Sequence, residues 1–297
     1  MKIYRTDQHP LPLPPGHRFP VEKYHLLYEA VREFAAPLIV DAPAASDAAL
    51  LAAHDAGYLA RLQHGTLSRA EERALGLPWS NELLVRSRHS VGATIAACST
   101  ALNEGCGVSL AGGTHHAYAD HGSGFCVFND SAVALKLLLQ AGALQHALVI
   151  DLDVHQGNGT AAMLADVPSL FTFSMHGRNN FPFQKEMSDW DIELDDGCND
   201  ARYLDVLAGS LPQLFTLARP ELVIYLAGAD SYQGDRLGKL SLSTAGLAAR
   251  DALVLDHCQR FGIPVAITMG GGYATPIADT VAIQATTVHA ACLRYAS

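Results

Sequence analysis

The sequence predicts an α/β fold of three layers, in which a central, mainly parallel sheet is flanked by helices on both faces. Two observations lead to this prediction. Short apolar runs such as residues 222–226 and 264–268 alternate along the chain with longer segments that have helical spacing. These runs are apolar throughout, which is typical of strands that are buried on both faces of a parallel sheet.

The predicted strands are short apolar runs, most of which lead into a glycine-rich or polar segment. They cover residues 1–5, 108–110, 146–153, 170–174, 222–226 and 264–268. We expect the first of them to lie at an edge of the sheet. Residues 9–20 hold five of the 14 prolines and cannot form a helix. They are expected to form a long surface loop, and a second loop is expected over residues 175–189.

The predicted helices are recognised by apolar spacing and by capping residues. Tyr24, Leu27 and Val31 recur at helical spacing, for example, and Asn129 or Asp130 can cap the helix that starts at residue 132. The helices are expected over residues 21–34, 48–53, 58–63, 81–103, 132–140, 160–164, 200–217, 243–261 and 277–294.

Length and charge limit the class of protein. The 297 residues allow one large domain or two small ones, and no repeat or change of composition marks a linker. We therefore expect a single domain over residues 1–297. A formal net charge of -10 and a pI near 5.7 argue against a general binder of nucleic acid or anionic membranes. No apolar run approaches the ~20 residues of a membrane-spanning helix.

The cysteines and the first residues indicate the compartment. The six cysteines are widely scattered and form no Cys-x-x-Cys pair, so they are expected to be reduced and mostly buried. Residues 1–6 lack the apolar segment of a secretory signal. A cytoplasmic enzyme fits these features.

One segment contains the most specific chemistry. Asp151, Asp153 and His155 follow the apolar run 147–149 at alternate positions and precede a glycine-rich stretch. Because strand side chains repeat every two residues, all three could project from one side of an extended strand. Two carboxylates and an imidazole are costly to leave unpaired at such a place. A bound divalent cation would resolve that cost.

Three other polar segments follow predicted strands, where sites form in open α/β sheets. They contain the pair His115 and His116, then Asp230, and then Tyr273 after three glycines. Taken singly, each has a structural interpretation. An aspartate after a strand often caps a helix, adjacent histidines arise by chance among 14, and a tyrosine at a turn is often half-buried.

Together these residues fit metal-assisted hydrolysis of an amide. A set of two aspartates and one histidine leaves a coordination position open, as catalytic zinc requires. The metal can polarise a carbonyl and activate water, and a neighbouring histidine can transfer the proton. A tyrosine hydroxyl can donate to the developing oxyanion, a contribution often worth ~3 kcal/mol.

Five motifs occur in order along the chain, within a similarity that runs from about His17 to the last helix. They are residues 112–116, 122–130, 151–155, 228–230 and 271–273. In this combination they resemble the histone deacetylase family, which has the arginase–deacetylase fold. The resemblance implies a sheet of about eight strands flanked by helices. Residues 156–159 and 234–238 look most like the class IV branch and its bacterial relatives.

The resemblance implies the metal ligands. Zinc is expected at Asp153, His155 and Asp230, with Fe²⁺ as an alternative native ion. Asp151 is then a partner of His115 and not a zinc ligand. The resemblance also implies a structural K⁺ or Na⁺ ion, and the residues expected to hold it are Asp151, Asp153, His155, Ser174 and Met175.

The resemblance also implies the catalytic roles. His116 is expected to act as general base and acid, with His115 as the second histidine and Asp151 behind it. Asn158 stands where other classes have an aspartate behind the catalytic histidine. Since an amide supplies less negative charge, His116 is expected to be less basic than in those relatives. Tyr273 is the expected oxyanion donor.

Substrate is expected to contact four residues, namely Gly124, Phe125, Phe181 and Gly272. The two phenylalanines match the aromatic walls of the family's acyl tunnel, although Phe181 has an ordinary loop anchor as its alternative role. Lys23 replaces an arginine that lines the family's inner cavity. Cys126 lies near the site and is expected to pack in the interior.

The leading hypothesis is a zinc-dependent deacylase that cleaves acyl-lysine, carrying acetyl or a longer fatty acyl group, or a related acylated amine. An acetylpolyamine amidohydrolase is the alternative within the same chemistry. A catalytically silent acyl-lysine-binding protein is the alternative outside it, and the presence of Tyr273 argues against this. A manganese ureohydrolase would need paired aspartate motifs that the sequence lacks.

Overall fold

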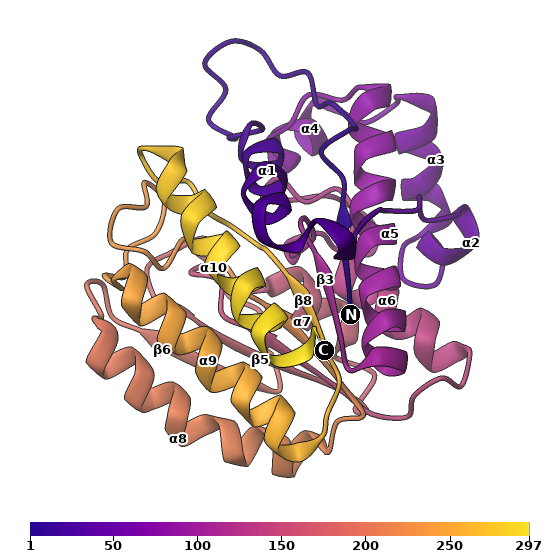
Figure 1. The fold of residues 1–297 in the computed structure, drawn as a ribbon. Helices are drawn as coiled ribbons and strands as arrows, with labels where there is room; N and C mark the ends of the chain where they lie inside the picture. The colour runs from indigo at the N-terminus through magenta and orange to yellow at the C-terminus, as the bar shows by residue number, and fades with distance from the viewer. Residues whose placement is uncertain (297) are drawn as a thin grey trace.

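The computed structural model describes residues 1–296 and contains one eight-stranded sheet between two layers of helices (Figure 1). Every strand pair is parallel, and the strand order is β2-β1-β3-β8-β7-β4-β5-β6. The predicted three-layer α/β fold with a mainly parallel sheet is therefore confirmed. The strands are β1 Lys2–Arg5, β2 Ile39–Asp41, β3 Cys106–Ser109, β4 Ala147–Asp151, β5 Leu170–Gly177, β6 Trp190–Leu194, β7 Leu222–Leu226 and β8 Val265–Thr268.

The helices form a layer on each face of the sheet. One layer contains α1 Lys23–Ala35, α8 Asp200–Ala218, α9 Thr244–Phe261 and α10 Ile277–Tyr295; the other contains α5 Asn81–Glu104, α6 Asp130–Gln140 and α7 Asn158–Leu164. In Figure 1 the first layer covers the sheet on the left, and α5 and α6 cover it on the right. The short helices are α2 Asp47–Leu50, α3 Ala56–His64, α4 Arg69–Leu75 and the 3₁₀ turn η1 Ala36–Leu38.

The sheet separates two hydrophobic cores, and alternate strand residues enter each of them. In β4, Leu148 and Ile150 pack with α8 and α9, whereas Val149 packs with α5 and α6. This alternation follows from the two-residue repeat of strand side chains. Both faces are apolar because both are covered by helices, which explains the continuous apolar runs in the sequence.

The edges of the sheet differ from the sequence prediction. β1 was expected at an edge, but β2 pairs on its outer side, with Ile3 opposite Ile39. The other edge strand, β6, was not predicted, and it pairs with a β5 that extends to Gly177. Two carboxylates, Asp191 and Glu193, flank the apolar Ile192 at the centre of β6 and hide its strand character. Edge strands commonly contain such charges.

β4 ends at Asp151, two residues earlier than predicted. The Asp151 side chain accepts a hydrogen bond from the backbone N–H of Asp153 at 3.1 Å, which bends the chain away from the sheet. Asp153 and His155 therefore lie in the following loop. The idea that the three side chains project from one extended strand is wrong in this respect.

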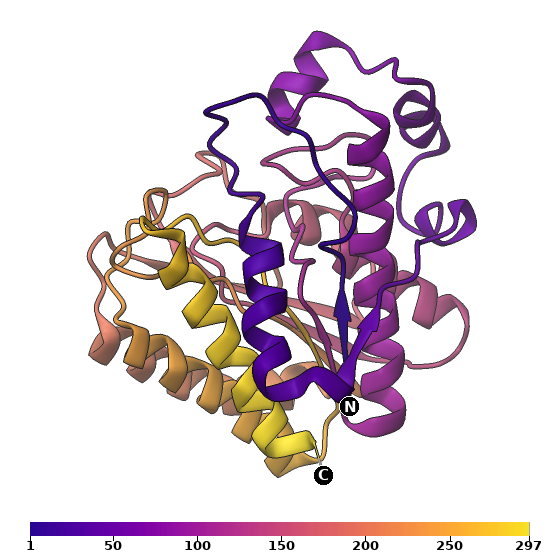
Figure 2. The same ribbon diagram turned by 45° about the horizontal axis from the view of Figure 1, so that its top comes forward.

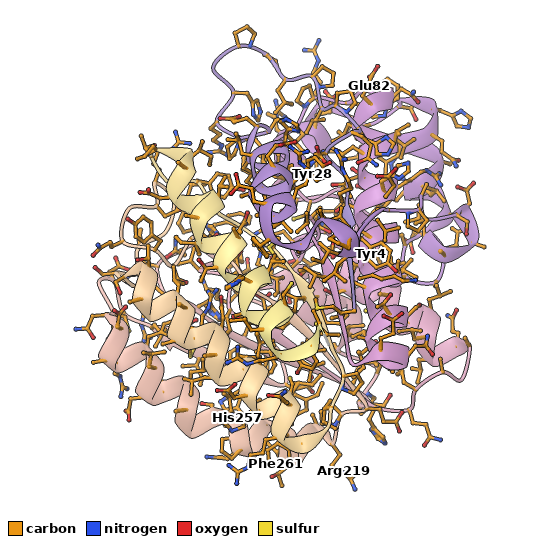
Figure 3. All side chains as sticks on the ribbon, viewed as in Figure 1. Tyr4, Tyr28, Glu82, Arg219, His257 and Phe261 are labelled. Atoms are coloured by element: carbon orange, nitrogen blue, oxygen red, sulfur yellow. The ribbon has the colours of Figure 1, made fainter. Side chains whose placement is uncertain are left out.

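The orientation of the strands defines one end of the molecule as the candidate site. Arg219 and Phe261, which precede β7 and β8, lie at the lower end in Figure 3. The carboxyl ends of these strands therefore point toward the opposite end. The indigo loop of residues 9–20 crosses that end, as Figure 2 also shows.

None of the helices within residues 1–296 is both long enough and apolar enough to cross a membrane. All six cysteines are free thiols; Cys98, Cys106, Cys126 and Cys258 are buried, and Cys198 and Cys292 are half-buried.

Candidate metal and catalytic site

The sheet order brings the four predicted segments together. β3, β8, β7 and β4 are consecutive neighbours, and they are parallel. Their carboxyl ends therefore lie side by side, although the segments that follow them are far apart in the sequence. The His115–His116 pair follows β3, Tyr273 follows β8, Asp230 follows β7, and Asp151 ends β4. All five residues are buried.

Asp153, His155 and Asp230 form a group that can hold a metal ion. Each offers a ligand atom within 4.8 Å of the others. His155 Nδ1 lies 2.9 Å from Asp153 Oδ1 and 3.2 Å from Asp230 Oδ2. Asp230 Oδ2 is fully buried and has no hydrogen-bond partner among the described residues. A buried carboxylate oxygen without a partner is costly, so this donor set fits a divalent cation.

The electrostatics of this group lead to the same conclusion. Burial, and then the charge of Asp153, raises the pKa of Asp230 to about 7. Burial lowers the pKa of His155, but the two carboxylates outweigh burial and raise that pKa to about 10. These pKa shifts mean that a positive charge beside the two buried carboxylates stabilises the group. A divalent cation supplies that charge and leaves His155 Nδ1 free to act as a ligand.

Backbone groups hold the two carboxylates in place. The N–H of Gly271 donates to Asp153 Oδ2 at 2.7 Å, and the N–H of Val154 donates to Asp230 Oδ1 at 2.9 Å. A Cβ atom on Gly271 would lie 1.9 Å from Asp230 Oδ2, so only glycine allows this approach. The glycines before Tyr273 therefore have a specific role beside the candidate ligands.

A buried arginine, which sequence reasoning missed, stabilises the two loops that contain the candidate ligands Asp153 and Asp230. Arg250 of α9 donates from Nη1 to the carbonyl oxygens of Gly228, at 2.6 Å, and Leu152, at 3.3 Å. Its charge is balanced by Asp251, whose Oδ1 lies 2.9 Å from Arg250 Nε. These carbonyls lie just before the candidate ligands Asp230 and Asp153. The sequence signal that could have revealed this arginine is the charged pair Arg250 and Asp251, which stands at helical positions where apolar residues are expected.

His115 is hydrogen-bonded to Asp151. Its Nδ1–H donates to Asp151 Oδ2 at 2.6 Å. Burial alone would lower the pKa of His115, but Asp151 and then Asp153 raise it to about 9. Asp151 is thereby engaged with His115 and with the Asp153 backbone, and it lies outside the group of three candidate ligands.

A chain of hydrogen bonds fixes the tautomer of His116. Tyr118 donates its hydroxyl proton to Glu186 Oε1 at 3.1 Å, and that hydroxyl oxygen accepts from Asn158 Nδ2 at 2.9 Å. Asn158 Oδ1 is therefore turned toward His116 and accepts from its Nδ1–H at 2.6 Å. The lone pair of the neutral imidazole is then on Nε2.

The surroundings of His116 favour its neutral form. Burial, and then the charges of His115 and His155, hold the pKa of His116 well below its ordinary value. Sequence reasoning found Asn158 but missed Tyr118 and Glu186. Tyr118 lies two residues after the histidine pair, but Glu186 belongs to a distant loop that no motif marks.

The segment 235–238 is hydrogen-bonded to the backbone of Tyr273. Asp235 Oδ2 accepts the Tyr273 N–H at 2.6 Å, and Arg236 Nε donates to the Tyr273 carbonyl at 2.9 Å. Burial raises the pKa of the Tyr273 hydroxyl well above its ordinary value, so it remains a neutral donor.

A cavity of about 630 Å³ connects these groups with the surface. Gly124, Phe125 and Phe181 line it, together with both histidines of the pair, the three candidate ligands and Tyr273. A Cβ atom on Gly124 would lie 2.5 Å from His116 Cδ2, so glycine keeps this wall close to the histidine. The Phe181 ring centroid lies 4.9 Å from that of His116. Gly272 is not among the described lining residues, whereas Gly270 and Gly271 are.

Lys23 and Cys126 also line this cavity. Lys23 is 2% exposed, and its Nζ lies 3.4 Å from the carbonyl oxygen of Gly270 and 5.4 Å from the ring centroid of Tyr273. Burial raises the pKa of the Cys126 thiol, so Cys126 is poorly suited to act as a nucleophile.

Three of the five residues expected at the monovalent cation site lie on the neighbouring strands β4 and β5. Asp151 at the end of β4 stands opposite Ser174 of β5, and Met175 follows on the same strand. The Ser174 hydroxyl is hydrogen-bonded to His176 Nδ1 at 2.9 Å. Asp153 and His155 follow in the loop after β4, and the ion itself stays a prediction.

The parallel sheet and the Asp–His–Asp group at its carboxyl edge define an α/β protein with a site that can hold a metal ion. The comparisons with known proteins agree with this description. The chain belongs to the histone deacetylase family, because the family's model of the histone deacetylase domain matches residues 17–289. Family membership supports deacylase activity in general terms.

Two relatives illustrate the range of similarity. An uncharacterized protein of Picosynechococcus sp. is 44% identical over 282 residues, which cover 94% of each chain. Histone deacetylase 2 of Arabidopsis thaliana is 33% identical over 256 residues, which cover 82% of this chain and 66% of that protein. The chain thus spans just under two thirds of the plant protein.

Two solved structures confirm the fold. The crystal structure of an HDAC homolog from Aquifex aeolicus superposes with a TM-score of 0.83 at 23% identity, covering 98% of this chain and 84% of the other. An HDAC homolog complexed with SAHA gives a TM-score of 0.82 at 23% identity, with 96% and 83% covered. The predictions of the family and of the arginase–deacetylase fold are confirmed, and class IV stays a prediction.

Proposed function

We propose that the chain is a zinc-dependent deacylase that hydrolyses the amide of acyl-lysine or of a related acylated amine. The observation that carries this proposal is the Asp153–His155–Asp230 group in a cavity that His116 and Tyr273 also line. We take residues 1–297 as a single catalytic domain. Its class IV character rests on the motifs at residues 156–159 and 234–238.

Asp153, His155 and Asp230 would hold Zn²⁺, with Fe²⁺ as the alternative native ion. When bound, the cation polarises the carbonyl of the acyl group and lowers the pKa of water at the site. A structural K⁺ or Na⁺ would lie beside Asp151 and Ser174, where it would offset the buried negative charge.

His116 would move the proton. Its Nδ1–H is held by Asn158, so Nε2 can accept a proton from water in the cavity and deliver it to the leaving amine. His115, paired with Asp151, would keep a positive charge beside the reaction. Phe125 and Phe181 would enclose the acyl chain, and Gly124 would allow the substrate backbone to approach.

Tyr273 would donate its hydroxyl proton to the carbonyl oxygen as negative charge develops there. Replacing Tyr273 by phenylalanine keeps the ring beside Phe125 and Phe19 but removes this donor. We expect kcat to fall about 100- to 1,000-fold, with a much smaller change in KM and an unchanged metal content. Steady-state kinetics on an acetyl-lysine peptide measure this, and an unchanged kcat excludes the oxyanion role.

Tyr118 would act through Asn158 as a positioning residue. In Tyr118→Phe the Asn158 amide loses the acceptor that fixes its orientation, so the His116 tautomer is less well held. We expect kcat to fall roughly tenfold while KM and metal content stay the same. Glu186→Gln should have a smaller effect in the same direction. A change confined to KM would contradict this role.

The substrate class can be tested by profiling the metal-loaded protein on lysine peptides with acyl chains from acetyl to myristoyl, alongside acetylated polyamines. Hydrolysis of the lysine amides supports the proposal. A preference for the polyamines would favour the acetylpolyamine alternative. Binding of acyl-lysine without turnover would instead identify a silent binder.

A further inference from the structure

Among the residues that the structure describes, the exposed part of the cavity lining contains cations and no carboxylate. Arg18, Arg73 and Lys239 line it, and all three side chains are exposed; we call them the cationic mouth. The only carboxylates among the described lining residues are Asp153 and Asp230, which are buried in the candidate metal group. The mouth therefore has the opposite sign to the chain as a whole, whose formal net charge is -10.

The charges of this mouth are largely free to act on a substrate. Within residues 1–296, neither Arg18 nor Arg73 takes part in an ion pair, and Lys239 has only Asp196 at 4.0 Å. The carboxylates that flank Arg73 along the chain are engaged elsewhere. Glu71 pairs with Arg61 at 2.9 Å, and Glu72 accepts a hydrogen bond from a tryptophan backbone N–H.

The fold places the three cations around one opening. Arg18 comes from the loop of residues 9–20, Arg73 from the last turn of α4, and Lys239 from the segment that follows β7. The loop and α4 are joined by His17 Nε2, which lies 3.1 Å from the Gly76 carbonyl oxygen, and Figure 1 shows them at the same end of the molecule. The Arg18 guanidinium lies 4.9 Å from the centre of the Phe125 ring, a wall of the cavity.

We propose that the cationic mouth selects acylated lysines that lie in acidic peptide segments and disfavours acylated polyamines. Carboxylates that flank the acyl-lysine would be attracted to these side chains, whereas the remaining ammonium groups of a polyamine would be repelled. This inference rests on the proposed deacylase function, and it separates the two substrate classes that share the same chemistry.

The test compares kcat/KM for three acetylated substrates on the metal-loaded protein. They are a lysine peptide flanked by aspartate and glutamate, the same peptide flanked by lysine and arginine, and an N-acetylated polyamine. We expect the acidic peptide to be preferred over the other two by about tenfold or more at about 0.05 M salt. The preference should shrink at about 0.5 M salt, because salt screens exposed charges.

Two variants show whether the mouth causes the preference. Arg73→Gln and Lys239→Gln should each reduce the ratio of acidic to basic peptide by about two- to fivefold, with kcat little changed. Arg18 is left intact because it packs on Phe125. Arg219→Gln is the matched control, since Arg219 is also exposed but lies at the opposite end of the molecule (Figure 3).

The outcomes separate this inference from the proposed function. Hydrolysis of all peptides with equal kcat/KM, or a preference for the polyamine, overturns the inference while amide hydrolysis stands. A preference for the acidic peptide that neither variant reduces also overturns it. Hydrolysis of none of the substrates overturns the proposed function, and the inference with it.

Discussion

Replacing Asp230 by alanine is expected to remove the bound metal and the activity together. Asp230 Oδ2 is buried and lies 3.2 Å from His155 Nδ1, and it has no hydrogen-bond partner of its own among the described residues. Without it, two donors remain, which is too few for the tetrahedral site of zinc. We expect zinc content to fall to background and kcat/KM to fall at least about 1,000-fold. Metal analysis and peptide hydrolysis on the same sample measure both.

A matched control separates this effect from a general loss of charge. Asp205→Ala removes an exposed carboxylate of α8 and should leave zinc content and turnover unchanged. Circular dichroism should show that both variants are folded. An Asp230→Ala protein with normal turnover would place the metal, or the chemistry, elsewhere.

Replacing His116 by alanine is expected to keep the metal and abolish most of the turnover. His116 Nε2 carries the lone pair that would accept the proton, and His116 is not one of the three candidate ligands. General acid–base catalysis contributes about 100- to 10,000-fold, so kcat should fall by that factor. KM and zinc content should change little.

A second variant tests whether proton transfer is the cause. His116→Gln keeps a polar side chain beside Asn158 but offers no basic nitrogen, so its kcat should be as low as that of the alanine variant. Added imidazole should restore part of the activity to His116→Ala. Near-normal turnover in both variants would assign the proton transfer to another group.

The sequence predicts the architecture well because apolar strands and amphipathic helices repeat with clear periods. The strand at residues 222–226 has the same limits in the structure, and Asn129 caps α6 as one of the two expected candidates. The pattern fails where tertiary structure decides. β2 and β6 lie at the edges of the sheet. β2 has only three residues, and the carboxylates Asp191 and Glu193 make β6 resemble loop sequence.

The candidate site is predictable to the extent that motifs mark it. The candidate ligand Asp230 reaches Asp153 only because β7 and β4 are adjacent in the sheet, and no spacing in the sequence expresses this adjacency. No sequence motif marks a contact that depends on a single distant side chain. One example is Glu186, which completes the hydrogen-bond chain behind Asn158. Another is Arg250, which donates a hydrogen bond to the Gly228 carbonyl oxygen.

The most direct test of the proposed function is turnover as a function of metal occupancy in the unmodified protein. Metal is removed with a chelator, Zn²⁺ is added back stepwise, and hydrolysis of an acetyl-lysine peptide is followed at each step. We predict that the metal-free protein is inactive and that activity rises in proportion to bound zinc, reaching its plateau at about one ion per chain. Full turnover by the metal-free protein would contradict the account.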